Sequence, residues 1–128
     1  MSDLKDKYPV IYPDGSVMWI HTNRNRMSED FRKAIRCNWL ENVYTVLPGI
    51  VIIVDEVGKV RQDPQIFNPV ASRLYGGAPY GDFIHGPAVV ASIGLTDEGM
   101  DWIPLQQSQL QRLQNWLHIK LPEDLYHV

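Results

Sequence analysis

The stretch from Asn68 to Ile93 constrains the fold most, because it combines a helix start, a helix end and a strand. Asn68 followed by Pro69 is typical of a helix start. The asparagine side chain can accept from an early backbone N–H, and proline at the first helical position needs no N–H partner. Gly76 suits the left-handed conformation that commonly ends a helix. The β-branched run Ala88–Ile93 then indicates a buried strand.

Four longer elements follow from the same reasoning. The sequence PDGS at residues 13–16 lies between two apolar runs and predicts a β-hairpin. Ser28 is a candidate N-cap for a helix of about Ser28 to Asn38. The uninterrupted apolar run Ile50–Val54 predicts a central strand that is buried on both faces. An apolar stripe predicts a last helix of about Gln106 to Leu117.

Shorter patterns complete the predicted order of elements. We expect strands at Val43–Leu47 and Met100–Ile103, a polar connection at Gly94–Gly99 and a final turn at Glu123–Tyr126. Val60–Asp63 is either a short return strand or an extended lead into the region of Pro64. Hairpins that alternate with single helices predict one α+β domain over residues 1–128, with a mostly antiparallel sheet and about three helices packed on it. A doubly wound parallel sheet is disfavoured, because most strand pairs lack a crossover helix.

Apolar periodicity also predicts which side chains form the core. The expected core residues are Ile50, Ile52, Val54, Val89, Leu110, Leu113 and Leu117. We expect all four tryptophans to be core or near-core, because large aromatic side chains on helices and strands are usually buried. They are Trp19, Trp39, Trp102 and Trp116.

Composition excludes several classes of protein. The 128-residue chain has a net charge of −3, which makes nucleic acid an unexpected partner. The local exception is a basic cluster at Arg24, Arg26, Arg32, Lys33 and Arg36. Its three helical members, Arg32, Lys33 and Arg36, are interpreted as a solvated helix face. There is no 18-residue apolar run and no signal-peptide pattern, so we expect no membrane span and a cytoplasmic location. The single cysteine, Cys37, excludes an internal disulfide.

The glycine-rich loop and its flanks are the predicted ligand-binding site. Three glycines within the six residues 76–81 allow the backbone to approach a ligand or to move aside. The predicted contacts are Arg73, Tyr75, Gly76, Gly77, Tyr80, Asp82 and His85. An arginine fork suits a phosphate or carboxylate, and the tyrosine rings suit a flat ligand. The alternative is a surface loop with turn chemistry. A phosphate loop is disfavoured, because these glycines follow a helix instead of preceding one.

Catalytic and metal-binding patterns are weak. His85 would serve as a general base if a carboxylate such as Asp82 lay beside it. Cys37 is expected near a helix end, where the helix dipole would not activate its thiol, and we predict that it is dispensable. The four histidines are scattered and lack metal-ligand spacing, so we predict no metal site and no cofactor.

Four segments together resemble a known family. They read VDEVGKV, NPVASRLYG, GDFIHGPAVVASI and DWIPLQQSQLQRL, and they span about Thr45 to Leu117. Their order is similar to a small phage and bacterial domain of unknown function. The resemblance carries no known chemistry, so it implies no catalytic residues. Gln106 and Gln107 depart from the pattern, in which an N-cap and an acidic first turn are typical.

Three functional hypotheses remain open. The first is a non-enzymatic binding protein, such as a phage or mobile-element accessory factor that sequesters a small molecule or blocks a host protein in an anti-defence role. The second is a small enzyme that uses His85 and Asp82 as acid and base. The third is a structural module that forms a homo-oligomer through an exposed apolar surface. Compact size and the lack of a catalytic constellation favour the first.

Overall fold

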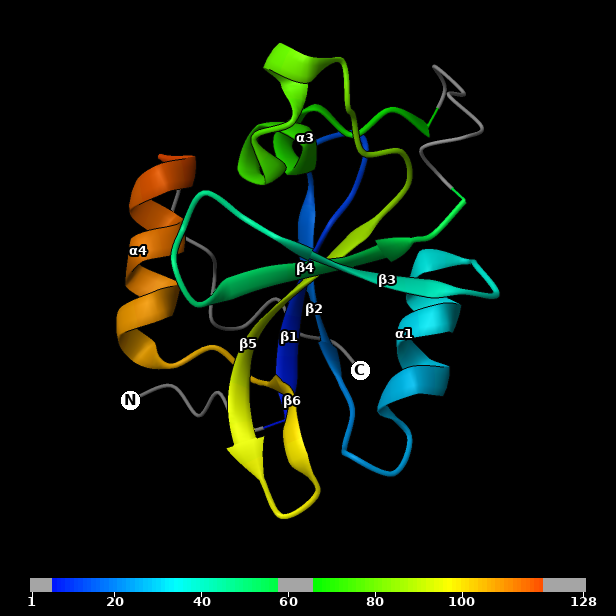
Figure 1. The fold of residues 1–128 in the computed structure, drawn as a ribbon, viewed down its shortest axis with the longest axis vertical. Helices are drawn as coiled ribbons and strands as arrows, with labels where there is room; N and C mark the ends of the chain where they lie inside the picture. The colour runs from blue at the N-terminus through cyan, green and yellow to red at the C-terminus, as the bar shows by residue number, and fades with distance from the viewer. Residues whose placement is uncertain (1–5, 58–65, 119–128) are drawn as a thin grey trace.

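A computed structural model describes residues 6–57 and 66–118 of the chain. Six strands and three α-helices are assigned there, in an α+β fold, as predicted (Figure 1). In chain order the elements are β1 (Lys7–Ile11), β2 (Val17–His21), α1 (Met27–Ile35), β3 (Leu40–Tyr44), β4 (Ile50–Asp55), α3 (Pro69–Tyr75), the 3₁₀ turn η2 (Ala78–Tyr80), β5 (Ala88–Thr96), β6 (Gly99–Ile103) and α4 (Gln107–Leu117). The segment predicted at 60–63 and the turn predicted at 123–126 lie outside the described residues.

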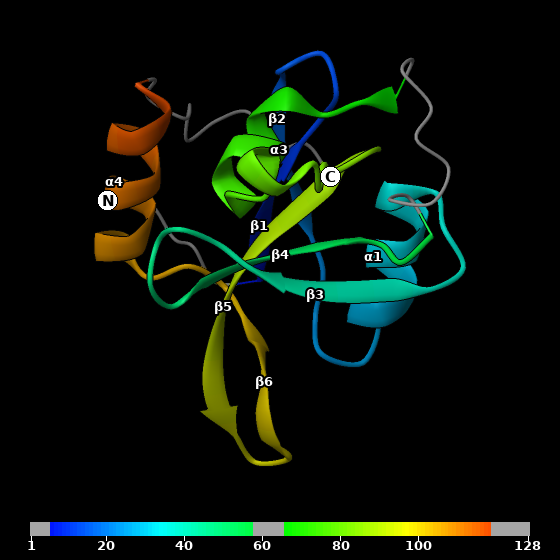
Figure 2. The same ribbon diagram turned by 45° about the horizontal axis from the view of Figure 1, so that its top comes forward.

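One antiparallel sheet contains all six strands, in the order β2-β1-β5-β4-β3, with β6 also paired to β5. The long strand β5 is central. Along one edge it pairs with β4, where Val90 lies opposite Ile52. Along the other edge it pairs first with β1 and then, past its middle, with β6. The outer half of β5 therefore forms a β-hairpin with β6 that projects beyond the helices (Figures 1 and 2).

Side-chain alternation divides the core into two clusters, one on each face of the sheet. Ile50, Ile52 and Val54 of β4 pack with α3 and α4, whereas Val51 and Ile53 pack with α1. The domain therefore has three layers, with α1 on one side of the sheet and α3 and α4 on the other (Figure 1).

The predicted core is largely confirmed. Six of the expected side chains are buried, and Leu117 is half-buried against the same cluster as Leu113. The prediction for the tryptophans holds for Trp19, which is buried, and for Trp102 and Trp116, which pack against the clusters. It is wrong for Trp39, which is 65% exposed in the connection between α1 and β3.

Helix α1 begins and ends earlier than predicted. Ser28 is not the cap, because the helix begins at Met27 and residue 26 takes the N-cap position without a side-chain bond. The preceding turn is closed by Asn23, whose Oδ1 accepts from the Arg26 N–H at 3.2 Å. The helix ends at Arg36, which has a left-handed backbone with a φ of 62°. Cys37 therefore follows the helix, close to its predicted position.

Strand β3 is displaced toward the N-terminus relative to the prediction of Val43–Leu47. Thr45 leaves the strand because its hydroxyl donates to the Ile50 carbonyl at 2.7 Å and accepts from the Leu47 N–H at 3.1 Å. These local bonds form the turn into β4. A threonine hydroxyl can thus replace ladder bonds that periodicity alone would predict.

The polar connection predicted at 94–99 is wrong, because β5 continues to Thr96 and turns directly into β6. Gly94 lies opposite Asp101 in the ladder, and any side chain at 94 would collide with Ile103. Glycine thus permits close packing within the strand here and does not mark a loop. The turn itself uses Gly99, whose φ is +100°.

The start of helix α4 is fixed by side-chain hydrogen bonds. Gln106, which departs from the family pattern, is the N-cap of α4 and forms a capping box with Gln109. The Gln106 N–H donates to Gln109 Oε1 at 2.8 Å.

The predicted first hairpin is confirmed, and its turn is fixed by Asp14. The hydroxyl and N–H of Ser16 both donate to this carboxylate, which lowers the pKa of Asp14.

Candidate functional site

Asn68 organises the region predicted to hold the site. Its Oδ1 accepts from the Ala71 N–H at 3.0 Å, which confirms the predicted N-cap of α3. Its Nδ2 donates to the carbonyls of Ile11 at 3.0 Å and Gly86 at 2.9 Å. The side chain is fully buried and therefore joins β1, α3 and the segment that leads into β5.

The loop after α3 is folded against itself. The Tyr75 hydroxyl donates to Asp82 Oδ2 at 2.5 Å, and the Asp82 N–H donates to the Gly77 carbonyl at 3.0 Å. A side chain at 77 would collide with the Asp82 carbonyl and the Tyr75 ring. Gly76 ends the helix with a φ of 81°, as predicted. Tyr75 and Asp82 thus lie together, and their bond stabilises the loop.

Arg73 and Tyr80 lie apart from that pair. The Arg73 guanidinium carbon is 5.3 Å from the ring centroid of Trp116, so this cation stacks on α4. Tyr80 is 87% exposed on η2. The predicted binding residues therefore do not gather at one place. Arg73 stacks between two helices, Tyr75 and Asp82 close the loop, and the ring of Tyr80 is exposed. Their role in binding a ligand stays a prediction.

His85 is buried between the loop and β5. It is 7% exposed, forms an isolated bridge with Phe67, and its ring centroid is 5.8 Å from that of Phe67. In the part of the chain that the structure describes, its Nδ1 is buried without a hydrogen-bond partner. Asp82 accepts from Tyr75 instead. The structure therefore does not bring the predicted acid–base pair of His85 and Asp82 into a hydrogen bond.

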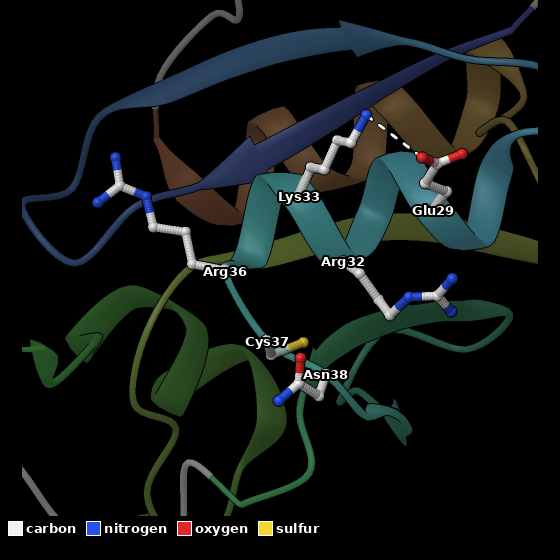
Figure 3. A pocket seen from close by; sticks show the side chains of 6 residues that line it. All are labelled: Glu29, Arg32, Lys33, Arg36, Cys37 and Asn38. Atoms are coloured by element: carbon white, nitrogen blue, oxygen red, sulfur yellow. Dashed lines mark ion pairs between the residues drawn. The ribbon is translucent and has the colours of Figure 1, made fainter.

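Three members of the basic cluster, Arg32, Lys33 and Arg36, line an open hollow of about 390 Å³ at the C-terminal half of α1 (Figure 3). Its lining residues are Glu29, Arg32, Lys33, Arg36, Cys37 and Asn38. Lys33 pairs with Glu29 at 3.4 Å. Arg32 and Arg36 form no ion pair among the described residues, and their side chains point away from each other (Figure 3). This divergence does not form a site for one anion and fits the predicted solvated face.

A different surface carries the exposed apolar side chains. Helix α1 covers only part of its side of the sheet, through Met27, Phe31 and Ile35. By strand alternation and register, five apolar side chains occupy the remaining part of the same side. They are Tyr44, Ile93, Leu95, Met100 and Trp102, and we call this surface the open sheet face. Tyr44, Leu95 and Met100 are 73%, 81% and 66% exposed.

A second hollow, of about 380 Å³, lies in the open sheet face. Its lining residues are Asn42, Tyr44, Ile93, Met100, Asp101 and Trp102. Trp102 lines the hollow, and two contacts hold its ring in place. The ring centroid lies 5.7 Å from that of Phe31 on α1, and the indole N–H donates to Asn42 Oδ1 at 2.8 Å. The Arg24–Asp101 ion pair, at 2.7 Å, ties the loop before α1 to β6. The hollow is thus held in shape by polar bonds around apolar side chains.

Sequence reasoning missed this surface for a specific reason. The polar connection predicted at 94–99 places Leu95 outside a strand and therefore gives it no register with Met100. The available signal was the alternation of Ile93, Leu95 and the short turn before Met100, which together are typical of a β-hairpin with one apolar face. Large apolar side chains gathered on a surface mark interaction sites more often than single exposed ones.

Neither metal chemistry nor a membrane span has support in the described residues. Within residues 6–57 and 66–118, histidine, cysteine and acidic side chains form no group of three or more that could hold a metal ion. Over the same residues, no helix has the length and apolar character needed to cross a membrane. The prediction of a cytoplasmic location remains a prediction.

The fold and its surfaces define a small α+β domain with helices on both sides of an antiparallel sheet and one partly uncovered side. The chain belongs to a family described as a domain of unknown function (DUF3846), whose model matches residues 9–118. The predicted resemblance to a small domain of unknown function is therefore confirmed, and the match begins well before Thr45. No curated protein and no solved structure matches the chain.

Proposed function

We propose that this protein is a non-enzymatic binding protein that docks another protein on its open sheet face. The observation that carries the proposal is the row of exposed Tyr44, Leu95 and Met100 beside a structured hollow. Burying a large apolar side chain contributes about 1.5–3 kcal/mol, so covering this surface provides a substantial driving force for association. A methionine among the contacts also lets such a surface adapt to its partner.

A protein partner fits this surface better than a small ligand does. Pockets for small ligands bury most of the ligand surface. Here Leu95 stands on a hairpin that projects from the domain (Figures 1 and 2) and does not line the hollow, so a small molecule in the hollow would contact Met100 but leave Leu95 exposed. In a phage or mobile element, such a protein would act as an accessory factor that blocks a host protein.

The test compares two variants for retention of a partner. The double variant Leu95→Ser, Met100→Ser removes the apolar pair, and Tyr80→Ser is the matched control, since it removes an equally exposed apolar side chain from the predicted loop site. Each immobilised protein is exposed to bacterial extract, and bound proteins are quantified by mass spectrometry. We expect a partner that the parent and Tyr80→Ser retain and the double variant loses.

Retention by the double variant with loss from Tyr80→Ser would contradict the proposal and support the loop site instead. Melting curves of all three proteins exclude unfolding as the cause. Native mass spectrometry of the parent addresses the two other hypotheses, because it reports a carried small molecule and the number of subunits together.

A further inference from the structure

We infer that the segment docked on the open sheet face is a cationic amphipathic helix of another protein. This inference rests on the proposed function and adds the chemistry of the partner. It follows from the charges around the face, from the hydrogen bonding of β6, and from what a second copy of the chain could offer.

The tip of the projecting hairpin is acidic. Asp97 and Glu98 are exposed in the turn between Leu95 and Met100, and their carboxylates form no ion pair or hydrogen bond among the described residues. Asp101, also at the hollow, is already balanced by Arg24. The apolar pair is therefore flanked by two uncompensated negative charges.

The cations of α1 do not balance this tip. The N-terminal end of α1 is the end nearer the hairpin, because Arg24 just before it reaches Asp101. Two of these cations are already paired, Arg26 at the N-cap with Asp30 and Lys33 in the last turn with Glu29. Arg32 and Arg36, which form no ion pair among the described residues, lie in the last turn and at the C-cap, at the opposite end of the helix. A partner over Leu95 and Met100 therefore meets a negative potential, which favours lysine or arginine at its flank.

The hydrogen bonding of β6 favours a helix over an added strand. A partner strand would need free backbone N–H groups along the edge of β6. The Trp102 N–H is already taken by Asp101 Oδ1 at 2.7 Å and is not available to a partner strand. Docking through side chains remains, and an amphipathic helix supplies apolar side chains along one face with cations beside them.

A second copy of the chain offers a poorer fit. The three described helices each carry at least one arginine, and all three have already buried their apolar faces against their own sheet. Pairing two open sheet faces would place two acidic tips, each with Asp97 and Glu98, on the same interface. Like charges at an interface oppose association. Homo-dimerisation is therefore an alternative outcome of the test below.

The test uses three helical peptides that share one composition of apolar residues. The first has an amphipathic pattern with lysine on its polar face, the second has the same pattern with glutamate, and the third is a scrambled lysine peptide without an apolar face. Affinities are measured by fluorescence anisotropy for the full chain, for Asp97→Asn, Glu98→Gln, and for Leu95→Ser, Met100→Ser. Light scattering gives the oligomeric state of each protein.

We expect the parent to prefer the lysine amphipathic peptide over both others. Neutralising the tip should weaken this binding roughly 2- to 30-fold and reduce its salt dependence, since two exposed charges are removed. The Leu95→Ser, Met100→Ser variant should lose binding while keeping its melting temperature.

Three results overturn the inference in distinguishable ways. Binding that needs Leu95 and Met100 but shows no preference between lysine and glutamate peptides would refute the cationic partner and leave the proposed function standing. Peptide binding unaffected by loss of Leu95 and Met100, or no binding at all, would refute the inference and count against the proposed surface. A parent dimer that Leu95→Ser, Met100→Ser dissociates would identify a second copy as the occupant.

Discussion

Helices cover the two sides of the sheet to different extents. On one side, α3 and α4 cover Ile50, Ile52 and Val54, and the buried Asn68 joins three chain segments. On the other side, α1 covers the inner half and the outer half carries the exposed Leu95 and Met100. Both sides are built from the same strands.

The difference separates stability from binding. Side chains on the covered side are buried in the folded protein and exposed on unfolding, so they stabilise the fold. Side chains at the tip of the open side are exposed in both states, so selection for stability does not explain large apolar residues there. The comparison therefore predicts large stability losses on one side and small ones on the other.

The largest expected effect is at the centre of the covered side. Ile52→Ala should lower the free energy of unfolding by about 2–5 kcal/mol, because Ile52 is fully buried in β4 and a cavity would remain. Urea denaturation followed by circular dichroism measures the loss. A transition that overlays the parent would show that β4 is not central to the core.

Asn68→Ala should be the next largest effect, at roughly 2–4 kcal/mol. The change removes an N-cap and leaves the buried carbonyls of Ile11 and Gly86 without their donor. The exposed Asn25, changed to alanine, is the matched control and should unfold like the parent. Equal stability of the two variants would mean that water replaces the Asn68 bonds at little cost.

Sequence reasoning predicted the covered side well because its signals are local. Caps, glycine ends and apolar periodicity identified α3, α4 and β4, and the hairpin order predicted the antiparallel sheet. Strand register is a non-local property, so local signals did not predict the pairing of Leu95 with Met100 or the extension of β5. The burial predicted for Trp39 is wrong for a related reason, since α1 ends at Ile35 and Trp39 lies in the exposed connection to β3 instead of directly after the helix.

The candidate site was predicted less well, because shared sequence neighbourhood does not place side chains together. Tyr75 and Asp82 do meet, but Arg73 lies over Trp116 on a distant part of the chain. Neither the Tyr75–Asp82 bond nor the Arg73–Trp116 contact could be predicted from the local sequence. The open sheet face combines β3 with β5 and β6, which are even further apart in sequence.

A third prediction sharpens the comparison at the α3–α4 contact. Arg73→Ala should lower the free energy of unfolding by about 0.5–1 kcal/mol, because it removes an exposed cation–π contact with Trp116. Arg32→Ala, which removes an arginine without such a contact, should have a smaller effect. Chemical denaturation of the two variants in parallel decides this. If Arg73→Ala kept full stability but abolished binding, the predicted loop site would regain support.

The smallest stability effect is expected at the hairpin tip. Leu95→Ser, Met100→Ser should change the free energy of unfolding by no more than about 0.5 kcal/mol per site, since both side chains are largely exposed in the folded protein and little apolar area is lost. A loss comparable to that of Ile52→Ala would show that this surface is covered in solution, as it would be in a stable dimer. Dilution separates these cases, because the stability of a dimer depends on protein concentration whereas that of a monomer does not. An unchanged melting curve together with lost partner binding would show that the apolar side chains at the tip serve association and contribute nothing to the fold.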